Sequence, residues 1–104
     1  MDLAHSIVRT DDQLTIELTG DIDMTTADEL CDVMLAALGT PGITAVNIDL
    51  HHVTFIDSSA IGALVSGLEA AEEAGRSFQV DRPQGAVHRV LDIAGVLPAL
   101  RASE

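Results

Sequence analysis

Two neighbouring serines, Ser58 and Ser59, directly follow Asp57 in the middle of the chain. A serine at the start of a helix often caps it by accepting a hydrogen bond from a free backbone N–H. This short turn carries a carboxylate and two hydroxyls, whereas one capping side chain would suffice. The preceding Phe55 and Ile56 are expected to be buried and to hold the turn at the surface on a rigid support. We therefore expect hydroxyl chemistry here, beyond simple capping.

The spacing of apolar residues predicts the elements on either side of this turn. Apolar and polar residues alternate over residues 44–50, which predicts a strand, and residues 51–57 form the loop that leads to the serines. From Ile61 onward the apolar period changes from 2 to about 3.6, which predicts a helix. This helix extends from about Ser58 to Ala74, with a glycine following as its C-cap.

The N-terminal part of the chain predicts a hairpin and a helix. Over residues 4–20 apolar residues alternate with polar ones on both sides of an acidic turn, as in a β-hairpin. Residues 20–25 form a short loop, and Thr25 or Thr26 caps the helix that follows. The apolar face of that helix repeats at helical spacing and consists of Ala27, Leu30, Cys31, Met34, Leu35 and Leu38.

The C-terminal part predicts a fourth strand and two shorter helical segments. Residues 77–80 alternate as a strand, and Pro83 suits the start of a helix that continues to Ala94. A last amphipathic turn covers residues 96–100 and closes the sheet. We expect the chain after Arg101 to be frayed.

The order of these elements predicts one α/β domain over residues 1–104, with a mixed sheet of about four strands and three to four helices. A helix connects the second strand of the hairpin to the strand at residues 44–50. By the usual crossover rule these two strands are expected to be parallel partners.

Composition restricts the classes of partner. Seventeen acidic residues against five arginines and no lysine give a formal net charge of -12. Nucleic acid and anionic membrane both require cationic contacts, so neither is an expected partner. The acidic charge either suits a protein partner with a basic surface or serves only to keep a small protein in solution. No apolar run approaches the roughly 20 residues that span a bilayer, and no signal-peptide pattern is recognised. The single cysteine, Cys31, excludes an internal disulfide and is expected to be a small core residue. We expect a cytoplasmic protein.

Two motifs carry a resemblance to a known family. Residues 55–62, Phe-Ile-Asp-Ser-Ser-Ala-Ile-Gly, resemble the phosphorylation-site motif of STAS domains, in particular of the bacterial anti-sigma factor antagonists. Residues 18–23, followed by Thr25 or Thr26, look like the second signature of that family. The resemblance covers nearly the whole chain, in the family's order and spacing. It departs at Ala60, where the family usually has glycine.

The resemblance implies a phosphorylation-switched regulator without enzymatic activity, cofactor or metal of its own. Ser58 matches the phosphate acceptor, while Asp23, Asp57, Ser58 and Ser59 match the surface that docks the partner. In these antagonists the unmodified form binds a serine-kinase anti-sigma factor and frees its sigma factor. The kinase, with its own ATP and magnesium, phosphorylates the serine and ends the interaction, and a serine phosphatase restores it. The free protein is expected to be a monomer.

Three other interpretations are weaker on sequence grounds. A hydrolase would use Asp57 and Ser58 with His51, His52 or His88, but the Gly-x-Ser-x-Gly elbow is absent. A metal site built from the paired histidines and Asp49 lacks a closed set of ligands. A STAS subunit of a lipid or anion transport complex, or of a stress-sensing assembly, would keep the fold without the phosphoswitch. The intact Asp-Ser-Ser turn favours the sigma-regulatory role.

Overall fold

Four strands and four helices follow one another over residues 3–101, the part of the chain that this computed structural model describes. The fraying expected after Arg101 concerns residues outside that part. The elements are β1 (Ala4–Thr10), β2 (Gln13–Ile22), α1 (Ala27–Leu38), β3 (Ala45–Ile56), α2 (Ser58–Ala74), β4 (Ser77–Asp81), α3 (Gly85–Ile93) and α4 (Leu97–Arg101).

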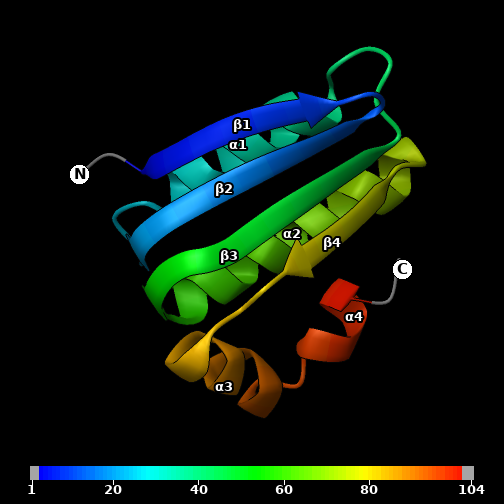
Figure 1. The fold of residues 1–104 in the computed structure, drawn as a ribbon. Coiled ribbons are helices and arrows are strands. Elements are labelled where there is room, and N and C mark those ends of the chain that lie inside the picture. The colour runs from blue at the N-terminus through cyan, green and yellow to red at the C-terminus, as the bar shows by residue number, and fades with distance from the viewer. Residues whose placement is uncertain (1–2, 102–104) are drawn as a thin grey trace.

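The strands form one mixed sheet in the order β1-β2-β3-β4 (Figure 1). β1 and β2 are an antiparallel hairpin, whereas β2 pairs with β3, and β3 with β4, in parallel. Each parallel pair is connected through a helix, α1 for the first and α2 for the second, because parallel neighbours require a crossover. The predicted α/β class, the mixed sheet and the parallel pairing of the second and third strands are confirmed.

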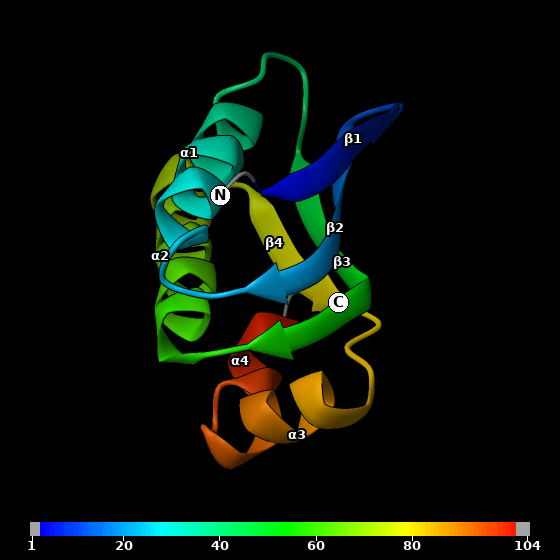
Figure 2. The same cartoon turned by 90° about the vertical axis from the view of Figure 1, so that its left-hand side faces the viewer.

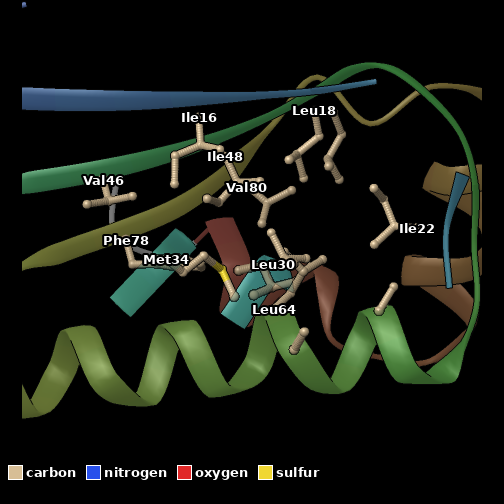
Figure 3. Packing of buried hydrophobic residues seen from close by; sticks show 14 of the residues in the cluster. Ile16, Leu18, Ile22, Leu30, Met34, Val46, Ile48, Leu64, Phe78 and Val80 are labelled. Atoms are coloured by element: carbon tan, nitrogen blue, oxygen red, sulfur yellow. The ribbon is translucent and has the colours of Figure 1, made fainter. Parts of the chain in front are cut away.

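The core lies between the sheet and the helices α1 and α2, which cover the same face (Figure 2). α3 and α4 lie at the β3 and β4 side of the sheet, and each buries apolar side chains there. Alternate residues of the central strands point inward, as the period of two predicts. Figure 3 shows this packing, with Ile16, Val46, Ile48, Phe78 and Val80 from the strands and Leu30, Met34 and Leu64 from the helices.

Two strands are longer than predicted. β2 passes through Gly20 and ends at Ile22, so the first half of the loop expected at residues 20–25 is strand. β3 continues past Leu50 to Ile56, where a loop was expected. Their pairing contains register shifts between Glu17 and Thr19 and again after Gly20. Bulges of this kind interrupt strict alternation, and alternation was the signal used to locate the strands.

The same irregularity explains one wrong burial prediction. In the second half of β3 the buried residues are Leu50, Val53 and Ile56, each separated from the next by two exposed residues. Ile56 is buried as expected, but Phe55 is 50% exposed. A second burial prediction is wrong for another element: Leu35 of α1 is exposed, although it was assigned to the apolar face of that helix.

A buried carboxylate anchors the connection that follows β4. Asp49 of β3 is almost fully buried and accepts two hydrogen bonds from the Arg82 guanidinium, at 3.2 Å from Nε and 2.5 Å from Nη2. Burial alone raises the pKa of the Asp49 carboxyl, but hydrogen bonds from Arg82 and the His51 backbone, with the Arg82 charge, lower it overall. Arg82 adopts a positive φ of 53°, which is uncommon for a residue other than glycine. The ion pair thus holds an unfavourable backbone turn in place.

Gly67 allows α2 to pack closely against its neighbours. A Cβ at this position would lie 2.8 Å from Met34 Sδ and 3.0 Å from the Phe78 ring. Met34 belongs to α1 and Phe78 to β4, so this point of α2 contacts both a helix and the sheet. A side chain larger than hydrogen would force these neighbours apart.

We predict that Gly67→Ala destabilises the fold and that Gly62→Ala, in the same helix, does not. Overpacking costs about 1–3 kcal/mol, which exceeds the roughly 1 kcal/mol by which alanine is the better helix former. At Gly62 a Cβ meets nothing within 4 Å, so only the helix-propensity gain remains there. Chemical denaturation of both variants measures the difference. A Gly67→Ala variant as stable as Gly62→Ala would contradict the tight packing.

Candidate functional site

The ends of β2 and β3 bring the two predicted acidic residues to the same edge of the sheet. Ile22 and Ile56 are partners in the parallel register, and the Asp57 backbone N–H donates to the Ile22 carbonyl at 3.3 Å. Asp23 and Asp57 directly follow the last residues of β2 and β3. In open α/β sheets, ligands and partners commonly bind outside the carboxyl ends of the strands.

Asp57 caps helix α2. Its side-chain Oδ1 accepts a hydrogen bond from the Ala60 backbone N–H at 3.0 Å, and its own backbone is extended. The simpler interpretation of Ser58 or Ser59 as the N-cap therefore does not hold, because the carboxylate before them fills that role. A carboxylate also interacts favourably with the positive end of the helix dipole.

Ser58 is the first residue of α2, and its side chain is exposed and takes no part in the cap. Ser59 is only partly exposed and lines, with Met24, a groove between α1 and α2. The two hydroxyls thus differ in access. The arrangement leaves Ser58 open to a modifying enzyme on a rigid helix terminus.

Asp23 organises the loop between β2 and α1. Its Oδ1 accepts hydrogen bonds from the Thr25 backbone N–H at 2.9 Å and from the Thr25 hydroxyl at 2.6 Å. Its backbone N–H donates to Thr26 Oγ1 at 3.2 Å. Both threonine side chains therefore bond to Asp23, and Thr26, the N-cap residue of α1, makes no side-chain cap bond.

The hydrogen bonds from Thr25 lower the pKa of the Asp23 carboxyl, the side-chain bond having the largest effect. This carboxylate is therefore ionised at neutral pH. Because its Oδ1 is occupied by the loop, Asp23 presents mainly a fixed negative charge next to the turn.

Two exposed apolar residues near the turn were missed by the sequence reasoning. Met24 follows Asp23 and is 76% exposed, and Phe55 lies two residues before Asp57 and is half exposed. Large apolar side chains exposed near polar groups are typical of protein interaction sites. Nothing in the sequence indicates whether a methionine in a loop is exposed. The exposure of Phe55 could not be predicted because β3 departs from strict alternation there.

The histidines lie elsewhere. His51 and His52 belong to β3, not to a loop, and their exposed rings contact each other with centroids 4.7 Å apart. Within residues 3–101 no hydrogen bond joins Ser58 to a histidine, and no three metal-ligating side chains gather into a possible metal site. Asp49 is engaged by Arg82. The geometry therefore gives no support to the triad or the metal interpretation.

None of the helices within the described residues has both the length and the apolar character needed to cross a bilayer.

Comparison with known proteins gives a consistent fold assignment. A family model described as "Mlab, STAS domain" matches residues 5–98. The anti-sigma-B factor antagonist of Staphylococcus epidermidis is 25% identical over 104 residues, which cover 100% of this chain and 95% of that protein.

Solved structures under 25% identical share the same fold. The anti-sigma factor antagonist SpoIIAA in its unphosphorylated form has a TM-score of 0.75 and 23% identity, over 91% of this chain and 84% of its own. Bacillus SpoIIAA in the phosphorylated form has a TM-score of 0.68 and 21% identity, over 94% and 88%. A sulfate transporter family protein from Wolinella succinogenes has a TM-score of 0.75 and 22% identity, over 91% and 76%.

We predict that Asp57→Ala lowers stability while Ser58→Ala leaves it nearly unchanged. Loss of an aspartate N-cap costs about 0.5–2 kcal/mol. A loss of 1 kcal/mol lowers the Tm of a domain of this size by roughly 4–8 °C. Thermal unfolding followed by circular dichroism compares the two variants. An equal loss in Ser58→Ala would show that the serine, too, supports the helix start.

Proposed function

Because this chain belongs to the STAS domain family, we propose that it acts as an anti-sigma factor antagonist. Its unphosphorylated form binds a serine-kinase anti-sigma factor and thereby frees the sigma factor. Phosphorylation at Ser58 ends the interaction. The proposal rests on one observation at the turn: Asp57 caps the helix, so Ser58 is not needed for the cap and stays exposed. The curated relative named as an anti-sigma-B factor antagonist supports the same role.

The position of Ser58 suits a reversible phosphate. The first turn of a helix offers free backbone N–H groups and the positive end of the helix dipole, which favour an anion. Since the cap bond runs from Ala60 to Asp57, a phosphate on Ser58 leaves it intact. We therefore expect the modified protein to keep its fold and to change only its surface.

Release follows from charge and hydration at the docking surface. A phosphoserine carries about −1.5 to −2 charges at neutral pH. Asp23 and Asp57 already place negative charge at this edge. A partner that covers the turn would have to strip water from the phosphate and accommodate its bulk. Such a desolvation cost, without a matching cation, is sufficient to weaken the complex.

The proposed cycle assigns the chemistry to the partners. The kinase binds ATP and magnesium and transfers the phosphate, and a serine phosphatase removes it. This chain supplies the acceptor Ser58 and the docking residues Asp23, Asp57 and Ser59, and needs no cofactor or metal of its own. We place the cycle in the cytoplasm and treat the free chain as a monomer.

A second candidate keeps the fold and changes the role. The likeness to a sulfate transporter family protein is as close, by TM-score, as the likeness to unphosphorylated SpoIIAA. A STAS subunit of a lipid or anion transport complex, or of a stress-sensing assembly, would use the same scaffold without the phosphoswitch. Its gene would neighbour transport or stress-assembly genes, whereas an antagonist's gene would neighbour a kinase-type anti-sigma factor.

We predict that a kinase-type anti-sigma factor from the same genome phosphorylates the chain once, on Ser58. Incubation with ATP and magnesium, followed by intact-mass and fragment mass spectrometry, locates the phosphate. Ser58→Ala should remain unmodified, whereas Ser59→Ala should still carry one phosphate, on Ser58. Phosphate retained in Ser58→Ala would move the acceptor to Ser59. An unmodified, well-folded wild type with all such kinases would favour the scaffold role.

We further predict that Ser58→Asp weakens binding to that kinase by about tenfold or more while its thermal melt stays close to that of the wild type. The introduced carboxylate reproduces part of the charge of the phosphate at an exposed position. Calorimetric titration measures the affinity, with Ser58→Ala as the uncharged control, which should bind normally. Undiminished binding of Ser58→Asp would argue against a charge-based switch.

A further inference from the structure

A groove of about 270 Å³ runs between α1 and α2 and begins next to the serine turn. Met24, Asp28 and Cys31 line one side, and Ser59 and Ser66 the other. A smaller apolar hollow of about 80 Å³ also touches Cys31 and Ser66 and continues between the same helices to Leu35. Cys31, expected to be a core residue, is only partly buried and lies where the two hollows meet.

We propose that this groove docks the kinase partner, by receiving an aliphatic side chain of the partner together with an adjacent lysine or arginine. The inference rests on the proposed function, because it assigns the surface with which that partner is held. It extends the docking surface from the serine turn to the region between the two helices.

The size of the groove favours a protein segment as its occupant. Pockets for small molecules usually enclose about 300–1,000 Å³ and bury most of the ligand. This groove is smaller and is open along its length between the helices. It suits one or two side chains that protrude from a partner surface. Met24, which is 76% exposed, lines the groove, and Leu35, which is 56% exposed, lines the smaller hollow that adjoins it.

The charge along the groove selects a cationic neighbour for that aliphatic side chain. Asp28 lines the groove, and Asp32 lies one residue beyond Cys31 on the same helix. Burial and then the negative charges of these two aspartates raise the pKa of the Cys31 thiol. A lysine or arginine of the partner would find a complementary charge at Asp28.

The groove follows α2 away from the switch. Ser59 in its wall directly follows Ser58, and Ser66 lies seven residues further along the helix, which corresponds to about 10 Å. A segment seated along the groove would therefore hold Ser58 in a fixed position relative to the kinase. Loss of this seat should affect association with the kinase, and hence KM, more than the transfer of phosphate.

Ser66 is the position at which the groove can be closed without disturbing the core. Its side chain is exposed and lines both hollows. We expect Ser66→Phe to fill the groove and to raise the KM for phosphorylation by about tenfold or more, with kcat within about twofold of the wild type. The probe is the kinase that modifies Ser58 in the mass-spectrometry experiment.

Matched variants separate the groove from general effects of substitution. Ser66→Ala keeps the groove open, so a KM raised as far as in Ser66→Phe would trace the effect to the lost hydroxyl and contradict closure of the groove as its cause. Ala74→Phe places the same ring at an exposed position near the end of α2 and should leave KM unchanged. Asp28→Asn should raise KM and reduce its dependence on salt, whereas Glu73→Gln, exposed near the end of α2, should not.

Cys31 provides a second measurement that needs no substitution. It is the single cysteine of the chain, so its alkylation by iodoacetamide can be followed by mass spectrometry of its own peptide. Bound kinase should slow this alkylation by about tenfold or more if it covers the groove, because the reagent can then no longer reach the thiol freely.

The outcomes distinguish this inference from the proposed function. If Ser58 is phosphorylated but KM is unchanged in Ser66→Phe, or Cys31 is not protected in the complex, docking in the groove is contradicted. Neither result would contradict the phosphorylation switch at Ser58. A wild-type chain that no kinase binds or modifies would overturn the proposed function and this inference with it.

Discussion

Parallel pairing of β2 with β3 to their last residues is the constraint on which the site depends. Ile22 and Ile56 are register partners, and the Asp57 backbone N–H bonds to the Ile22 carbonyl. Because both strands end at the same level, the residues that follow them begin two helices side by side. Asp23 leads into α1 and Asp57 into α2. One strand pairing thus places two carboxylates, the serine turn and the groove between the helices along one edge.

The turn separates structural support from chemistry. Asp57 meets the demand of the helix for an acceptor, so the hydroxyl of Ser58 is not required by the fold. Asp23 likewise satisfies its own loop through Thr25 and Thr26. Both carboxylates are held by backbone N–H groups and keep their position whatever happens at Ser58. A modification can then alter the surface without altering the scaffold, which is the property that a binding switch needs.

Local patterns predicted most of the elements and placed the serines correctly, because helix and strand periods report burial directly. The bounds of α2 agree with the predicted 58–74, and Gly75 adopts the left-handed conformation of a C-cap. Exposure of Phe55 was not predictable, since it follows from register shifts between β2 and β3, which are neighbours in the sheet but far apart in the sequence. Nor was the groove, because it depends on how α1 and α2 pack against each other, and residues of both helices line it.

The contacts of three arginines bear on the charge at this edge of the sheet. Three of the five arginines hold the fold together: Arg9 donates to the Pro41 carbonyl, Arg76 to the Thr40 and Ile43 carbonyls, and Arg82 to Asp49. These three guanidinium groups therefore lie at loop carbonyls and at a buried carboxylate, away from the serine turn. The acidic residues along α1 and at the strand ends therefore keep a negative field. A partner with a basic surface would be attracted by this negative charge. A phosphate on the serine turn would add further negative charge where the partner comes closest to this chain.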